Sequence, residues 1–153
     1  MKIVLDCNIY DILAQDSECL TLLTSLIEKE DWKVLIPITL LDELKDSPFK
    51  GIPDWIQAEE HLDLVAVYGH TKYGEGCYGD GNIYECHKGN SIKIKDAIIV
   101  DFAVNKADIF VSEDRRARKR LLEMDVETQV YDYNDFKNLT RHWRPIKKPP
   151  AGF

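Results

Sequence analysis

Acidic side chains stand at the boundaries of several apolar segments in this chain of 153 residues. Asp6 directly follows one apolar run, and Asp114 lies just past the end of another. Glu43 and Asp96 fall near the starts of segments with helical spacing. Carboxylate oxygens are the ligands that Mg²⁺ and Mn²⁺ prefer, and two such ions can activate a water and stabilise the leaving oxygen when a phosphodiester is cut. Four acids in one place would therefore indicate a divalent metal centre.

The apolar pattern predicts strands that alternate with helices. The expected strands are 2–6, 32–37, 62–68, 108–112 and 128–133. The expected helices are 18–30, with Ser17 able to cap it, then 39–45, 95–105, 114–124 and 134–141. Such alternation implies an α/β domain with three layers, α/β/α, around a mainly parallel sheet covered on both faces.

This architecture gives the four acids a reason to meet. Ligand sites of open parallel sheets form at the carboxyl ends of the strands. Asp6 and Asp114 both follow strands, so they are expected at the same sheet edge, and Glu43 and Asp96 lie in helices that begin there. Because like charges at close range raise one another's pKa and repel, a divalent cation would stabilise such a cluster.

Four motifs resemble those of the PIN-domain ribonucleases, over nearly the whole chain and in the same order. They are VLDCN (4–8), IPITLLDEL (36–44), KDAIIVDFA (95–103) and VSEDRR (111–116). The resemblance implies a PIN-like fold with a Mg²⁺ or Mn²⁺ centre, whose catalytic and metal-binding residues are Asp6, Glu43, Asp96 and Asp114. Asn8 and Ser112 would orient these ligands. Cys7 departs from the family, which usually has a hydroxyl at that position.

The resemblance also implies an activity and partners. The expected activity is metal-dependent hydrolysis of RNA by an activated water, without a covalent enzyme intermediate. The resemblance leaves open a toxin–antitoxin role, in which an antitoxin inserts a basic side chain into the acidic site. It also leaves open a homodimer. The first alternative is a catalytically weak PIN-like module that binds RNA or protein.

A second alternative is phosphoryl chemistry of the haloacid-dehalogenase or receiver kind, which also uses an Asp after the first strand. The former requires a second Asp where Asn8 stands, and the latter requires an Asp at the end of a later central strand with a distant Lys. Neither pattern is present in the sequence.

Each acid also has a purely structural explanation. Asp6, Asp96 and Asp114 suit the N-termini of helices, and Glu43 suits a solvated helix surface. A fifth acid, Asp101, points about 140° away from Asp96 around the helix, so it is expected to be structural or solvated.

Two basic segments are candidates for RNA contacts. RRARKR (115–120) is either a solvated helix face or a phosphate clamp beside the metal, made by Arg115, Arg116 and Lys119. In RHWRPIKK (141–148), Trp143 either stacks on a base or packs on the domain. Glu113 is favoured as a surface residue over an outer ligand-orienting acid.

The segment 68–91 is rich in Gly and Tyr and is expected to form a projecting hairpin or flap, with Asp80-Gly81 as its turn. Its tyrosines could stack on RNA bases, but cross-strand pairing is favoured. Zinc binding is disfavoured because a paired Cys-x-x-Cys is missing. The tyrosines are Tyr68, Tyr73, Tyr78 and Tyr84, and the zinc candidates are His70, Cys77, Cys86 and His87.

Composition limits the remaining possibilities. A net charge of −7 argues against a simple basic nucleic-acid binder. No apolar run approaches the roughly 20 residues of a membrane span, and the start of the chain does not resemble a signal peptide. A cytoplasmic protein is expected, with one domain at 1–144 and a loose Pro-rich tail at 145–153. Its four cysteines are expected to be free thiols: Cys7, Cys19, Cys77 and Cys86.

Overall fold

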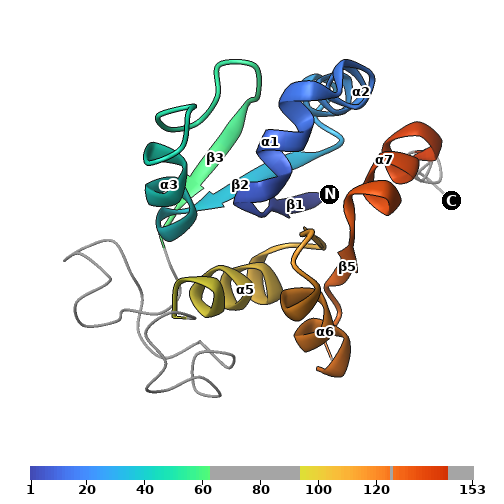
Figure 1. The fold of residues 1–153 in the computed structure, drawn as a ribbon. Coiled ribbons are helices and arrows are strands. Elements are labelled where there is room, and N and C mark those ends of the chain that lie inside the picture. The colour runs from blue at the N-terminus through green and yellow to red at the C-terminus, as the bar shows by residue number, and fades with distance from the viewer. Residues whose placement is uncertain (63–93, 125, 145–153) are drawn as a thin grey trace, which may run out of the picture.

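The computed structural model describes residues 1–62, 94–124 and 126–144, and the side chains of residues 94–96 lie outside this description. The described strands form one five-stranded, all-parallel sheet in the order β3-β2-β1-β4-β5 (Figure 1). They are β1 (Lys2–Leu5), β2 (Lys33–Pro37), β3 (Ala58–His61), β4 (Ile109–Val111) and β5 (Gln129–Tyr131). The predicted α/β class with a parallel sheet is confirmed.

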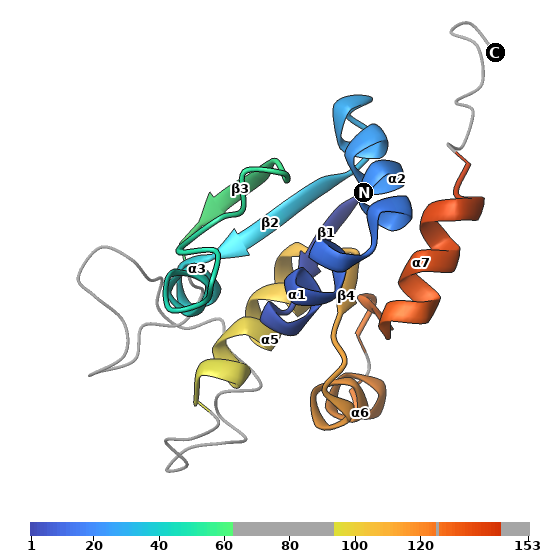
Figure 2. The same cartoon turned by 45° about the horizontal axis from the view of Figure 1, so that its top comes forward.

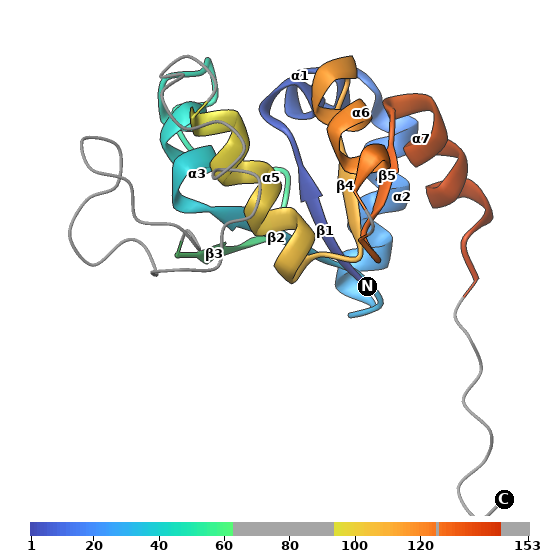
Figure 3. The same cartoon turned by 90° about the horizontal axis from the view of Figure 1, so that it is seen from below.

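Six helices accompany this sheet in the described part of the chain. They are α1 (Cys7–Gln15), α2 (Ser17–Glu28), α3 (Ile38–Lys45), α5 (Ile94–Lys106), α6 (Arg115–Glu123) and α7 (Tyr133–His142). Helices α1, α2 and α7 lie on one side of the sheet, with α7 packed against α2 (Figure 1, Figure 2). Helices α5 and α6 lie on the other side (Figure 3). The arrangement is consistent with a three-layer α/β/α fold.

The central strands are apolar because helices cover both of their faces. Ile3, Val4 and Leu5 of β1 are fully buried, and all three residues of β4 are buried as well. The largest buried side chains around them come from both helical layers, from β4 and from the residue before β2: Tyr10, Phe136, Phe102, Phe110 and Trp32. This core fixes the carboxyl ends of β1 and β4, where the acids follow.

The structure contains a strand that the prediction missed, Ala58–His61, which pairs with β2. The third predicted strand was 62–68. Leu62 follows the strand and is 47% exposed, and residues 63–68 lie outside the described residues. The sequence AEEH lacks an apolar run because β3 is an edge strand with a half-exposed surface, so periodicity could not identify it.

Two helix predictions also change. Helix α1 adds an element to the predicted set, and the N-cap of α2 is Asp16 instead of Ser17. Asp16 accepts a hydrogen bond from the backbone N–H of Cys19 at 3.2 Å.

Cys7 and Cys19 are free thiols, as expected. The insertion 68–91 and the tail 145–153 lie outside the described residues, together with every predicted zinc ligand and tyrosine in the insertion. None of the described helices has both the length and the apolar character needed to cross a membrane.

Candidate functional site

The strand order creates a topological switch point between β1 and β4. From β1 the chain passes through α1 and α2 to β2, and it reaches β4 through α5 on the opposite face of the sheet. In sheets of this kind, ligands bind in the crevice at the carboxyl ends of the two strands. Asp6 follows β1 and Asp114 follows β4, at the end of the sheet where α1 and α6 begin (Figure 3).

A buried serine joins these two aspartates. The Ser112 hydroxyl donates a hydrogen bond to Asp6 Oδ2 at 2.8 Å and accepts one from the backbone N–H of Asp114 at 3.1 Å. Ser112 has no exposed surface, so water does not compete for these bonds. The turn after β4 is thereby fastened to the end of β1, and the two acids are held in one place.

Both aspartates also cap helices, as their structural explanation predicts. Asp6 Oδ1 accepts the N–H of Cys7 at 2.8 Å at the start of α1, and Asp114 Oδ1 accepts the N–H of Arg116 at 2.9 Å at the start of α6. Capping occupies one oxygen of each carboxylate. It does not account for the buried hydroxyl that binds the other oxygen of Asp6, and this second feature is typical of an oriented ligand.

The electrostatics of Asp6 favour a bound cation. Burial raises the pKa of Asp6 above its usual value; the hydrogen bonds from Ser112 and Cys7 lower it but do not offset the burial, and the nearby charge of Asp114 raises it further. The ionised form of Asp6 is therefore disfavoured without a counter-charge. A divalent cation between the carboxylates would reverse that balance.

Glu43 lies within electrostatic range of the same place. Burial raises the pKa of Cys7 to about 11, and the charges of Glu43, Asp6 and Asp11 contribute to the rise. The charge of the half-buried Glu43, on α3, therefore acts at the start of α1, but among the described residues Glu43 does not come close enough to Asp6 and Asp114 to form a three-acid metal group. Cys7 remains a protonated thiol at neutral pH. Position 7 lacks the hydroxyl usual in PIN domains, but Ser112 supplies a hydroxyl hydrogen bond to Asp6.

The backbone of α5 brings position 96 to this region, although the side chain of Asp96 lies outside the described residues. A cavity of about 10 Å³ is lined by Asp6 together with Ile99 and Val100 of α5. These two residues are three and four positions after 96, which is the spacing of neighbours on one helix face. Along the backbone of α5, position 96 therefore lies one turn before these two residues.

The available oxygen ligands suit a Mg²⁺ or Mn²⁺ ion that keeps several waters better than an ion coordinated by protein atoms alone. A carboxylate oxygen can accept about two hydrogen bonds, so each oxygen of Asp6 keeps room for a cation beside its single protein donor. Asn8 Oδ1 is buried and has no hydrogen-bond partner among the described residues. In that part of the chain, no three His, Cys, Asp or Glu side chains gather closely enough to hold a metal. Mg²⁺ needs only about one or two direct carboxylates, because it keeps several waters.

Two further acids have structural roles. Asp101 is fully buried, so its solvated alternative is wrong and its structural alternative stands. Glu113 is exposed, as expected, but its Oε1 also accepts the backbone N–H of Tyr133 at 2.6 Å. The turn after β4 is thus joined to the start of α7, a contact that sequence spacing could not reveal.

The basic side chains of α6 differ in exposure. Arg115, Arg116 and Lys119 are exposed, and Lys119 forms an ion pair with Glu123 at 3.9 Å. Arg118 is half-buried, and its Nη1 donates to the carbonyl oxygen of Ser112 at 2.8 Å. Sequence reasoning missed this residue, although its position four residues after Asp114 places it one helical turn from the site.

The second basic segment makes contacts within the domain. Trp143 packs edge-on against the buried Trp32, with ring centroids 5.8 Å apart and planes at 82°. Arg141 donates two hydrogen bonds to the carboxylate of Glu18, at 2.9 and 3.0 Å. The packing alternative for Trp143 is therefore confirmed.

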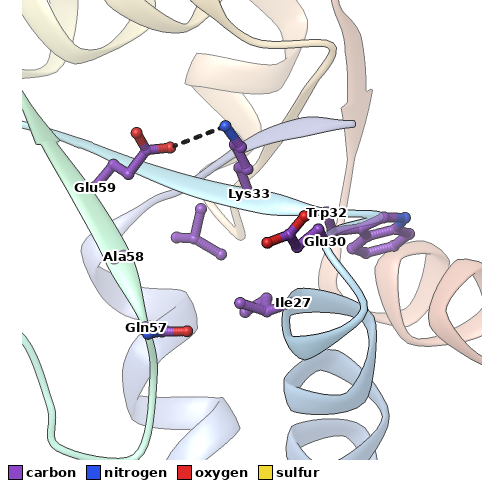
Figure 4. Close-up of a pocket in the computed structure, with 8 residues that line it drawn as sticks. Ile27, Glu30, Trp32, Lys33, Gln57, Ala58 and Glu59 are labelled. Carbon is purple, nitrogen blue, oxygen red and sulfur yellow. Dashed lines mark ion pairs between the residues drawn. The ribbon is translucent and has the colours of Figure 1, made fainter.

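A larger pocket lies at the other end of the sheet. Its volume is about 380 Å³, and its lining includes Ile27, Trp32 and Ala58 (Figure 4). Lys33 and Glu59 pair across its rim at 3.9 Å. Lys33 and Ala58 begin β2 and β3, so this pocket is at the amino ends of the strands, opposite the edge that carries Asp6.

Comparisons with protein-family models, curated proteins and solved structures found no match to this chain. The resemblance to PIN domains therefore rests on the four sequence motifs.

Proposed function

We propose that this protein is a PIN-like, metal-dependent endoribonuclease. The observation that carries the proposal is the buried hydroxyl of Ser112, which binds Asp6 and the backbone of Asp114 at the switch point of a parallel sheet. A pair of helix caps needs no such bridge. In a metal site, such a hydrogen bond orients the ligating carboxylate toward the cation.

In this proposal Mg²⁺ or Mn²⁺ is held by four acids: Asp6, Asp114, Glu43 and Asp96. The metal supplies two kinds of chemistry when bound: it activates a water for attack on the phosphate, and it stabilises the leaving oxygen. Ser112 orients Asp6 through its hydroxyl. Burial of Asp6 strengthens its interaction with a cation, since charges attract more strongly where water is excluded.

The exposed bases at the start of α6 support a polyanionic substrate. Arg115 and Arg116 directly follow Asp114, and both are exposed. The chain as a whole carries a charge of −7, so these residues form a local exception beside the acids. Their guanidinium groups are suited to bind a phosphate in two-pronged hydrogen bonds while the adjacent phosphate meets the metal.

Replacing Arg115 and Arg116 with alanine should weaken RNA binding and leave the chemical step largely intact. We expect KM to rise about 3- to 10-fold and the salt dependence of RNA binding to become shallower by about one unit of log–log slope for each lost phosphate contact. Kinetics and binding at several salt concentrations measure both. Lys106→Ala is the control, because Lys106 is an exposed base at the end of α5, near the amino end of β4 and opposite the start of α6; an equal effect there would reject a specific clamp at α6.

The experiment that tests the proposed function is RNA cleavage in Mn²⁺, Mg²⁺ and EDTA by the wild type, Asp114→Asn and Asp11→Asn. Asp11 is an exposed acid one helical turn after Cys7 on α1, so its replacement removes an equal charge near the crevice without changing either aspartate that Ser112 binds. We expect cleavage that EDTA abolishes, that Asp114→Asn loses and that Asp11→Asn keeps. Absence of both cleavage and metal binding in the wild type would reject the nuclease and favour an RNA- or protein-binding module.

A further inference from the structure

We infer that Arg118 is a positioning residue for the metal centre: its guanidinium holds the turn between β4 and α6 in the shape that sets Asp6 and Asp114 for a divalent cation. This inference rests on the proposed function, because it concerns the same centre. It assigns Arg118 a role different from that of its exposed neighbours on α6.

Ser112 is held at each of its polar groups. Its N–H donates to the carbonyl oxygen of Tyr131 at 3.1 Å, and its hydroxyl bridges Asp6 and Asp114. Its carbonyl oxygen accepts from Arg118 Nη1 at 2.8 Å. Of these partners, only Arg118 binds the peptide group that leads out of Ser112 toward Glu113.

That peptide group determines where Asp114 lies. The ladder between β4 and β5 pairs residues as far as Val111 and Tyr131, so the carbonyl of Ser112 lies beyond it. A peptide unit is planar, so fixing its oxygen fixes the direction in which the chain continues. Ser112 is fully buried, and without Arg118 its carbonyl would lose a charge-assisted hydrogen bond in a place with little access to water.

Helix α6 provides the reach. Arg118 follows the cap residue Asp114 by four residues, so its side chain can extend back over the first turn of the helix. On the other side of the turn, Glu113 accepts the N–H of Tyr133 at 2.6 Å. The turn is therefore held from α6 and from α7 at once, and Arg118 supplies the positively charged donor.

Mn²⁺ titration without RNA tests the inference, with calorimetry on the wild type, Arg118→Met, Arg118→Lys and Arg120→Met. Methionine keeps the aliphatic stem and removes the donors, and Arg120→Met makes the same change two residues along α6. We expect Arg118→Met to weaken Mn²⁺ binding about 10-fold or more, in the range seen for residues that orient metal ligands. Arg120→Met should stay within about 2-fold, and the slope of RNA binding against salt should not change in Arg118→Met.

Several results would overturn the inference. Wild-type Mn²⁺ affinity in Arg118→Met would do so, and so would an equal loss in Arg120→Met, which would indicate a general effect of charge. If Arg118→Met does not fold, Arg118→Lys decides, because an ammonium cannot reproduce the planar guanidinium fork and should weaken binding about 3-fold. Unchanged affinity in a folded Arg118→Lys would then reject the role. No Mn²⁺ binding by the wild type would instead reject the proposed function itself.

Discussion

Asp6→Asn should remove RNA cleavage and yet leave the metal-free protein as stable as the wild type or more stable. Asparagine is a poor ligand for Mg²⁺ or Mn²⁺ compared with a carboxylate, so we expect kcat to fall by about 10²–10³-fold or more, as when a main stabilising group is lost. The amide oxygen can still accept the N–H of Cys7 and cap α1. Activity and stability should therefore change independently at this position.

The pKa of Asp6 determines the sign of the stability effect. Burial raises that pKa above its ordinary value of 3.8, so the folded protein binds the proton more tightly than the unfolded chain. Stability then decreases as pH rises from about 3.8 through the raised pKa, and the ionised carboxylate disfavours folding at neutral pH. Asp6→Asn removes this dependence on pH.

Thermal unfolding with and without Mn²⁺ measures the effect. In the metal-free state, Tm of Asp6→Asn should equal that of the wild type or exceed it by a few degrees, whereas the rise in Tm that Mn²⁺ gives the wild type should be absent. Asp11→Asn should keep both the rise and the cleavage. Wild-type cleavage by a clean preparation of Asp6→Asn would show that Asp6 is not a ligand.

Asp16→Ala should cause a large loss of stability for the replacement of a single polar side chain. Asp16 lies between α1 and α2 and accepts hydrogen bonds from Lys137 Nζ at 2.7 Å, from the Tyr133 hydroxyl at 2.8 Å and from the N–H of Cys19 at 3.2 Å. Its removal takes away the cap of α2 and the main polar anchor of α7. We expect the free energy of unfolding to fall by about 2–3 kcal/mol, which corresponds to roughly 5–10 °C in Tm.

The pH dependence of Asp16 has the opposite sign to that of Asp6. The hydrogen bond from Lys137, with those from Tyr133 and Cys19, holds the pKa of Asp16 below its usual 3.8. Its contribution is therefore fully present above about pH 4 and is lost as pH falls through the lowered pKa. Urea unfolding between pH 2 and 7 should show this loss in the free energy of unfolding of the wild type at low pH. Asp16→Ala should lack it.

Glu18→Ala is the control for Asp16→Ala. Its side chain is 57% exposed and pairs with Arg141 at the rim of the same contact, so the expected loss is much smaller than that of Asp16→Ala. Equal losses for the two variants would show that the anchor is spread over the whole charged rim instead of being centred on Asp16.

The sequence predicted the elements that bury apolar side chains and failed where tertiary contacts decide. The runs around Ile3 and Phe110 identify β1 and β4 because both faces of these strands are covered. The strand Ala58–His61 has no such signature, since it lies at the edge of the sheet. Asp16 and Ser17 are equally good caps by type, and the choice of Asp16 depends on Lys137, more than a hundred residues away in the chain.

The candidate site was also predicted only in part from the sequence. Alternation of strands and helices was enough to place Asp6 and Asp114 at one sheet edge, because parallel strands end on the same side. The contacts that orient them depend on side-chain direction within RRARKR, where five similar bases differ only in the face of α6 that they occupy. Composition could not separate the inward Arg118 from the outward Arg116.

The most direct test of the metal centre as an RNA-cutting site is cleavage of a mixed single-stranded and structured RNA pool by the wild type and Asp96→Asn, in Mn²⁺ and in EDTA. Asp96 is the acid that sequence motif and helix position assign to the centre independently of the hydrogen bonds around Ser112. We predict cutting by the wild type in Mn²⁺, none in EDTA, and none by Asp96→Asn under either condition. Cleavage by Asp96→Asn at the wild-type rate, or wild-type cleavage that persists in EDTA, would contradict the account.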